Sequence, residues 1–229
     1  MVVEVVGAQS ARTTTLKEPP WSRGAARYAG EVTFERIEPS DMVLVRHGES
    51  SWNARRLVQG QNDEARLTDQ GREQALRAAE HLRAQQCDRI VASDLARTRE
   101  TAQIIADQLG LDIVYDADLR ERSYGVLEGG SLDAVTPVIV GVAGGVVVDE
   151  NAKAEGGESL RELRDRAGRF VRASKLRWPH ERLLVVTHGG TIRALRSYCA
   201  GTPMQGSEWD AVANCTIWTV SRPTDETGA

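Results

Sequence analysis

Short apolar runs alternate with longer stretches of amphipathic periodicity along most of this chain. Each run has the length and the β-branched content of a buried strand. The runs predicted to be strands cover residues 42–45, 89–92, 111–115 and 182–186. A further run at residues 215–220 is typical of a strand at the edge of a sheet.

The stretches between these runs carry helix signals. Thr68 fits an N-cap, and apolar residues recur at helical spacing from there to about Gln85. Ser93-Asp94 is typical of a strand-end turn and helix cap, and Gly110 ends the helix that follows. The remaining helices are predicted from Ser159 to Trp178-Pro179 and over residues 191–200. This alternation of strands and helices predicts a sheet with helices on both of its faces.

Two regions lack such a pattern. Proline and glycine punctuate residues 1–40, where only residues 31–37 alternate as a strand does. We interpret residues 1–40 as an N-terminal extension that packs on the body or on a second subunit, which leaves a homodimer open. The alternative is a misplaced start codon upstream of Met42. Residues 117–157 form a long connection, and such connections are usually lids or substrate loops. The predicted organisation is therefore this extension, a domain at residues 41–222 with a lid at about 123–157, and a tail at residues 223–229.

Composition and charge narrow the functional classes. The 229 residues are 41% hydrophobic and 27% charged, which is ordinary for one soluble α/β domain. A net charge of −4 without a basic run gives no sign of nucleic-acid binding, and no apolar stretch is long enough for a membrane span. The three cysteines suggest neither a disulfide framework nor a CxxC pair, so we expect a cytoplasmic location. No cluster of histidine and cysteine predicts a metal site.

Two of the predicted strands end in the same dipeptide. Arg46-His47-Gly48 follows the first strand, and His188-Gly189 follows the strand that ends at residue 186. Ligands of open α/β sheets bind at the carboxyl ends of the strands, so we expect both imidazoles at one site. A glycine at position 48 is expected to let a ligand approach the backbone closely. The other histidines are interpreted as solvated: His81 and His180.

Histidines and arginines at strand ends suit phosphoryl transfer. A phosphate dianion requires preorganised positive charge, and the guanidinium fork of arginine fits it. Arg46 is one such group, and Arg97, one turn into the helix after Ser93-Asp94, is a second. Cationic neighbours are expected to lower the pKa of His47 and keep it neutral, as a nucleophile must be. Glu121 is the candidate acid for the leaving alkoxide; taken singly, a solvated Arg97 and a loop salt bridge at Glu121 are the alternatives.

Several sequence blocks occur in a fixed order. The first is Arg46-His47-Gly48-Glu49-Ser50-x-Trp52-Asn53. The later blocks are Leu67-Thr68-x-x-Gly71-x-x-Gln74-Ala75, Ser93-Asp94-Leu95-x-Arg97-Thr98-x-x-Thr101-Ala102, Glu121 with Tyr124-Gly125, Gly157-Glu158-Ser159 and His188-Gly189. As a set they resemble the histidine phosphatase superfamily, in its phosphoglycerate mutase-like branch (branch 1), over residues 42 to about 201.

This resemblance implies a three-layer α/β/α sandwich around a mostly parallel sheet. It also implies a covalent phosphohistidine on His47, a proton donor at Glu121, no cofactor and no metal. The phosphate contacts that it implies are Arg46, Asn53, Arg97, His188 and the backbone of Gly189. Further substrate contacts are expected from Gln59, Gly60, Arg122 and Tyr124.

Hydrolysis and mutase chemistry are harder to separate. A mutase must hold a second phosphate, yet residues 131–152 contain no lysine or arginine. Ser123 stands where the mutase pattern Glu-Arg-His-Tyr has histidine, and Gln59-Gly60 resembles the phosphatase members. We therefore favour hydrolysis of a small phosphomonoester, with mutase activity as the alternative. Three residues remain as candidate contacts for a second anion: Arg55, Arg56 and Arg122.

Other classes fit less well. A catalytically silent binding module of the same fold usually lacks the nucleophile or the acid, and this chain has candidates for both. No cysteine is followed six positions later by arginine, as a cysteine-based tyrosine phosphatase requires. Asp116-x-Asp118 is a poor match to an aspartate-nucleophile phosphatase. The glycine- and valine-rich lid predicts a site partly lined by apolar groups, and a sugar phosphate, a phosphoglycerate derivative or a biosynthetic intermediate fits it.

Overall fold

The computed structural model describes residues 41–132, 142–143, 146–147, 149–204 and 212–223. The chain divides into two units, Met1–Ile37 and Glu38–Ala229, and every described residue belongs to the second. The strand considered at residues 31–37 and the whole extension at 1–40 lie outside the described residues. So does most of residues 135–148, the apolar part of the predicted lid.

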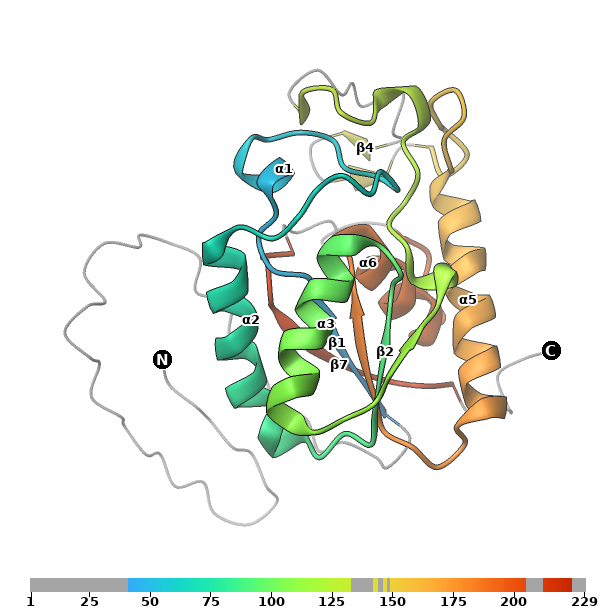
Figure 1. Cartoon of the computed structure of the whole chain (residues 1–229). Coiled ribbons are helices and arrows are strands. Elements are labelled where there is room, and N and C mark those ends of the chain that lie inside the picture. Colours follow the sequence, from blue (N-terminus) through green and yellow to red (C-terminus); the bar gives the residue numbers. More distant parts are fainter. Residues whose placement is uncertain (1–40, 133–141, 144–145, 148, 205–211, 224–229) are drawn as a thin grey trace, which may run out of the picture. The chain divides into compact units, whose positions relative to one another are not determined.

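The described residues form a five-stranded sheet with the order β3-β2-β6-β1-β7 (Figure 1). The strands are β1 (Asp41–Arg46), β2 (Arg89–Ala92), β3 (Ile113–Tyr115), β6 (Leu183–Thr187) and β7 (Ile217–Ser221). Every neighbouring pair is parallel except β1 with β7, which is antiparallel. All of the predicted strands are confirmed within two residues at either end, and the mostly parallel sheet is confirmed.

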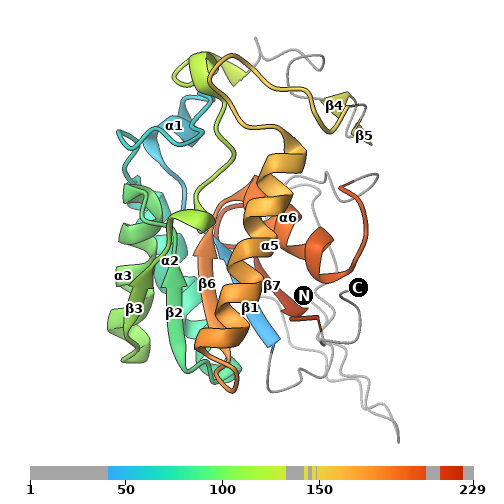
Figure 2. The same cartoon turned by 90° about the vertical axis from the view of Figure 1, so that its right-hand side faces the viewer.

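Helices cover both faces of this sheet (Figure 2). On one face lie α2 (Asp69–Leu82) and α3 (Ala96–Leu109), and on the other lie α5 (Leu160–Arg177) and α6 (Gly189–Cys199). Side chains of a strand alternate between the faces, so Val43 and Val45 pack with α2 and α3, while Met42 and Leu44 pack with α5 and α6. The chain is thus a three-layer α/β/α sandwich with a core on each side of the sheet.

Helix starts agree less well with the sequence signals. Thr68 is the N-cap of α2 as predicted, because its hydroxyl accepts a hydrogen bond from the Gly71 N–H. The assignment of Ser93-Asp94 as the cap of α3 is wrong: the N-cap is Leu95, and the Ser93 hydroxyl contacts His188 instead. Helix α6 begins at Gly189, two residues earlier than predicted. The first turn of α6 therefore lies directly beside the second histidine.

The long connection after β3 is only partly regular. It contains the 3₁₀ turns Ala117–Leu119 and Gly125–Leu127, and a two-stranded antiparallel pair of β4 (Val142–Ala143) and β5 (Val146–Val147). The described parts of the lid region and the short helix α1 (Ser51–Ala54) lie beyond the carboxyl edge of the sheet (Figures 1 and 2). Across the described residues, no helix is both long and apolar enough to cross a membrane.

Candidate active site

Strands β1 and β6 bring the two histidines together. Arg46 and Thr187 are paired in register, and the His47 N–H donates to the Thr187 carbonyl at 2.9 Å. The chain therefore leaves both strands at the same level of the sheet. The ring centroids of His47 and His188 are 5.2 Å apart with an interplanar angle of 63°, and both residues are buried. The structure therefore brings the two imidazoles side by side, as expected from the strand ends.

One hydrogen bond determines which nitrogen of His47 is the nucleophile candidate. Nδ1 lies 2.7 Å from the Gly48 carbonyl oxygen. A carbonyl can only accept, so Nδ1 carries the proton and Nε2 keeps its lone pair. Burial, followed by the charges of Arg97 and Arg46, lowers the pKa of His47 well below its ordinary value of 6.5. The imidazole is therefore neutral near pH 7, as a nitrogen nucleophile must be.

Gly48 allows a close contact, although its partner is not a ligand. A Cβ at this position would lie 2.3 Å from the Gly71 carbonyl oxygen, in the first turn of α2. The Gly48 N–H donates to the Thr101 hydroxyl at 3.1 Å, and that hydroxyl donates to the Arg97 carbonyl at 2.8 Å. The glycine thus packs the loop after β1 against two helices, which fixes the His47 backbone.

Arg46 and Arg97 supply positive charge beside the histidines. Arg97 is fully buried, and its two Nη groups donate to the Asn62 and Gly60 carbonyls at 3.0 and 2.7 Å. Burial lowers the pKa of Arg97 to about 10, so its guanidinium stays charged at neutral pH. Within the described part of the chain, the Nε atoms of Arg46 and Arg97 are buried without a hydrogen-bond partner. Unpaired buried donors are rare in proteins, and an anion would satisfy them.

His188 presents a similar unpaired atom. Its Nε2 lies 2.9 Å from the Ser93 hydroxyl, which orients the ring. Its Nδ1 is buried and has no partner among the described residues. Burial and the charge of Arg97 lower the pKa of His188 well below 6.5. His188 therefore carries one nitrogen that is held by the protein and one that an anion could engage.

Glu121 lies at the N-terminus of α6. Its Oε2 accepts from the Gly190 N–H at 3.0 Å, and its Oε1 accepts from the Arg122 N–H at 2.8 Å. A Cβ at Gly190 would lie 2.4 Å from Oε1, so only glycine leaves room for the carboxyl group. The Glu121 charge acts on both Arg46 and Arg97, since it raises the pKa of each against the effect of burial. The candidate acid therefore lies in the same electrostatic environment as the candidate phosphate contacts.

The loop after β1 contains the next predicted contacts. Asn53 Oδ1 accepts a hydrogen bond from the Ser50 N–H at 3.1 Å, in the capping box of α1. Asn214 Nδ2 donates to the same Oδ1 at 3.3 Å and to the His47 carbonyl at 2.9 Å. Gln59 Oε1 accepts from the Ser50 hydroxyl at 2.7 Å. Gly60 has a φ of +49°, and its carbonyl holds Arg97. Asn53, Gln59 and Gly60 therefore belong to one bonded cluster that includes the nucleophile candidate.

Arg122 and Tyr124 are placed differently. The Arg122 guanidinium donates to the Glu158 and Ala152 carbonyls, both at 2.7 Å, and lies over the Tyr124 ring at 5.4 Å from its centroid. Burial raises the pKa of Tyr124 to about 12, so its hydroxyl stays protonated. These contacts join the segment after Glu121 to the loop before α5. That either residue contacts substrate stays a prediction.

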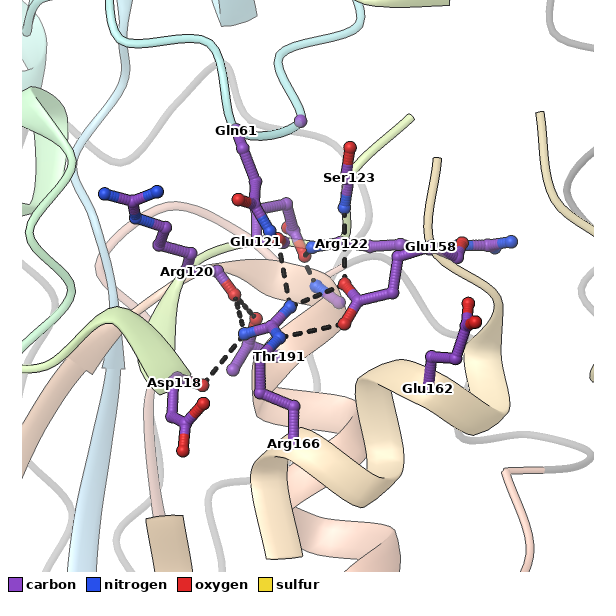
Figure 3. A network of polar contacts seen from close by, with 12 residues as sticks. Gln61, Asp118, Arg120, Glu121, Arg122, Ser123, Glu158, Glu162, Arg166 and Thr191 are labelled. Carbon is purple, nitrogen blue, oxygen red and sulfur yellow. Dashed lines mark hydrogen bonds and ion pairs between the residues drawn. The ribbon is translucent and has the colours of Figure 1, made fainter. Parts of the chain in front are cut away.

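Some residues of the site had no signal in the sequence. Ser93 was interpreted as a helix cap although it orients His188. Asn214 bridges the loop after β1 from a region that carries no motif. Arg166, on α5, holds the backbone of Glu121 (Figure 3). Among the described residues there is no group of three or more His, Cys, Asp or Glu that could hold a metal ion.

The family model of the histidine phosphatase superfamily (branch 1) matches residues 42–228. This chain belongs to the histidine phosphatase superfamily. Its blocks around Arg46-His47-Gly48 and His188-Gly189 thus stand in a family whose described members carry out phosphoryl chemistry. Its relatives include proteins named as a phosphatase and as a probable mutase.

One relative in sequence is the probable phosphoglycerate mutase GpmB of Salmonella choleraesuis (strain SC-B67). It is 40% identical over 178 residues, which are 77% of this chain and 82% of that protein. Among solved structures, the mycobacterial glucosyl-3-phosphoglycerate phosphatase matches with a TM-score of 0.67 and 25% identity, over 81% of this chain and 99% of that one. Bacillus stearothermophilus YhfR matches with a TM-score of 0.68 and 28% identity, over 78% and 89% of the two chains.

Proposed function

We propose that this protein hydrolyses a small phosphomonoester through a phosphohistidine on His47, without a metal ion. The observation that carries the proposal is the environment of one atom. His47 Nε2 is a neutral, proton-free nitrogen, buried beside Arg46 and Arg97 and next to His188. A nucleophile without a proton to lose, surrounded by cations, suits attack on a phosphate dianion.

The proposed reaction has two steps. In the first, His47 Nε2 forms a bond to phosphorus as the bond to the leaving oxygen breaks, and protonated Glu121 gives its proton to that oxygen. In the second, water attacks the phosphohistidine, the Glu121 carboxylate takes a proton from the water, and His47 leaves with its lone pair. Arg46, Arg97 and the α6 N-terminus stabilise the charge on the phosphoryl oxygens in both steps.

Hydrolysis is preferred over mutase chemistry because cations for a second phosphate are scarce near the lid. Residues 131–152 contain no lysine or arginine. Arg122, a candidate for this role, directs two of its donors at backbone carbonyls. The name of GpmB favours a mutase and that of the mycobacterial neighbour favours a phosphatase acting on a phosphoglycerate derivative. We propose a phosphorylated sugar or phosphoglycerate derivative as the substrate class.

A partition experiment separates the two activities. With 3-phosphoglycerate as substrate in the presence of a chelator, we expect release of inorganic phosphate, because water has access to the phosphohistidine when no second phosphate excludes it. Formation of 2-phosphoglycerate is expected to be negligible, even with added 2,3-bisphosphoglycerate. Both products are measured in the same time course. Isomerisation faster than phosphate release would favour the mutase, and activity lost in chelator but restored by a divalent metal would refute metal independence.

Replacing Glu121 with Gln tests the acid. We expect kcat/KM for an alkyl phosphate to fall about 10²-fold or more, because the alkoxide then leaves without a proton. An aryl phosphate should be affected much less, since a phenolate needs little protonation. Glu73→Gln, at an exposed ion pair on α2, is the control and should match the wild type. An equal loss on both substrates would contradict the acid role.

A further inference from the structure

A buried ion pair lies behind Glu121. Arg166 of α5 is 7% exposed, and its Nε and Nη2 meet the two carboxylate oxygens of Glu158 at 2.9 and 2.6 Å (Figure 3). This is the two-point geometry that a guanidinium and a carboxylate prefer. Burying such a pair removes both charges from water, so it contributes little net stability by itself. Its position in the structure therefore calls for another reason.

The same guanidinium binds three backbone carbonyls of one segment. Nη1 donates to the carbonyls of Asp118 and Arg120 at 2.8 and 2.7 Å, and Nη2 donates to that of Glu121 at 3.1 Å. From residue 120 to 124 the described chain lies outside helices and strands, so no regular secondary structure supplies hydrogen bonds to its backbone. Arg166 supplies these hydrogen bonds instead, to the carbonyl just before the acid and to the carbonyl of the acid itself.

Glu158 binds the backbone on the C-terminal side of Glu121. Its Oε2, which pairs with Arg166, also accepts from the Ser123 N–H at 3.3 Å. The ion pair thus contacts the backbone before, at and after Glu121 (Figure 3). Two further side chains reach the same segment: Thr191 donates to the Arg120 carbonyl and Gln61 to the Glu121 carbonyl.

We propose that Arg166 and Glu158 are a positioning pair that aims the Glu121 carboxyl group at the leaving oxygen. This rests on the acid role of Glu121 in the proposed function. Only a guanidinium can do this, because it has donors enough to face a carboxylate on one edge and three carbonyls on the other. A lysine keeps the positive charge but offers one nitrogen. Arg166→Lys therefore removes the geometry of the network while keeping its charge.

The test compares substrates that differ in the need for an acid. For Arg166→Lys we expect kcat/KM for an alkyl phosphate to fall about 10-fold or more, and for an aryl phosphate about threefold or less, since a misaligned acid loses part of the 10²- to 10⁴-fold effect of proton transfer. Arg169→Lys is the matched control. It lies one turn further along α5 and makes an exposed ion pair with the Asp118 carboxylate at 3.0 Å, so it should behave as the wild type.

A double variant separates positioning from general weakening of the fold. If Arg166 acts through Glu121, Glu121→Gln with Arg166→Lys should be no slower on the alkyl phosphate than Glu121→Gln alone. Multiplied losses, or equal losses of Arg166→Lys on both substrates, would overturn the proposal. Should Arg166→Lys fail to fold, Glu158→Gln carries the same comparison, because it disturbs the same network from the other side.

The outcome also distinguishes this proposal from the one on which it rests. If Glu121→Gln shows the leaving-group dependence and Arg166→Lys does not, the positioning pair is refuted and the proposed function stands. If Glu121→Gln itself shows no such dependence, the acid role fails, and the positioning pair is refuted with it.

Discussion

Replacing His47 with Ala should lower kcat/KM for every phosphomonoester by about 10⁴-fold or more, because it removes the atom that forms the covalent bond to phosphorus. A partial loss is not expected, because the buried arginines around His47 can bind the phosphate but cannot attack its phosphorus atom. The measurement pairs steady-state kinetics with trapping of labelled phosphoprotein. The trapped label should be stable in alkali and labile in acid, as a phosphoramidate is, and absent from the variant.

The control for this experiment is His81→Ala. His81 is exposed on α2, and its Nδ1 lies 2.8 Å from the Arg77 carbonyl of its own helix. Its loss should leave both turnover and labelling unchanged. Label that persists in His47→Ala would contradict the assignment and move the nucleophile to His188, the other buried imidazole of the site.

That His47 and His188 lie close together could be predicted from the sequence, because the prediction needs only the positions of the strands. Apolar runs mark buried strands, parallel strands share a carboxyl edge, and the residue after each strand therefore projects near its counterpart. Which strands are neighbours did not follow from those runs. The adjacency of β1 and β6, whose paired residues Arg46 and Thr187 are 141 positions apart, depends on packing across the whole sheet.

The parts that the sequence did not predict are held by contacts between distant residues. Ser93 looked like a helix cap because a serine before a helix usually is one, yet its hydroxyl orients His188. Arg166 and Glu158 belong to a charged helix and the loop before it, where charged residues are ordinarily solvated. Nothing in their local spacing indicates that their side chains turn inward to the backbone of Glu121. A single sequence carries no signal for such a network.

Arg97 shows how tertiary structure overrides a local expectation. An arginine near the start of a helix is usually solvated, yet this one is completely buried. Its guanidinium crosses to the loop after β1, where it binds the Gly60 and Asn62 carbonyls. The position of Arg97 in a sequence block suggested a phosphate contact, and its burial shows that the fold accepts the desolvation of this charge.

Replacing Arg97 with Met is expected to lower kcat/KM about 10³-fold near neutral pH, because a neutral side chain of similar length cannot stabilise the charge on the phosphoryl oxygens. The control is Arg99→Met on the same helix. Arg99 is exposed and lies over the Tyr115 ring at 4.7 Å from its centroid, so its loss should leave turnover near that of the wild type. Thermal unfolding of both variants shows whether the freed carbonyls of the loop weaken the fold.

The pH dependence of Arg97→Met provides a second, independent readout. The charge of Arg97 is one of the causes that lower the pKa of His47, so its removal should raise that pKa toward the ordinary value of 6.5. In the wild type, His47 stays neutral well below pH 6.5, and the acid limb of kcat/KM lies at low pH. In the variant, protonation of His47 begins at higher pH, so the acid limb moves upward and the loss relative to wild type is larger at pH 5 than at pH 8. A loss that is the same at every pH would show that Arg97 does not act on the nucleophile, and that its contribution is confined to the phosphate.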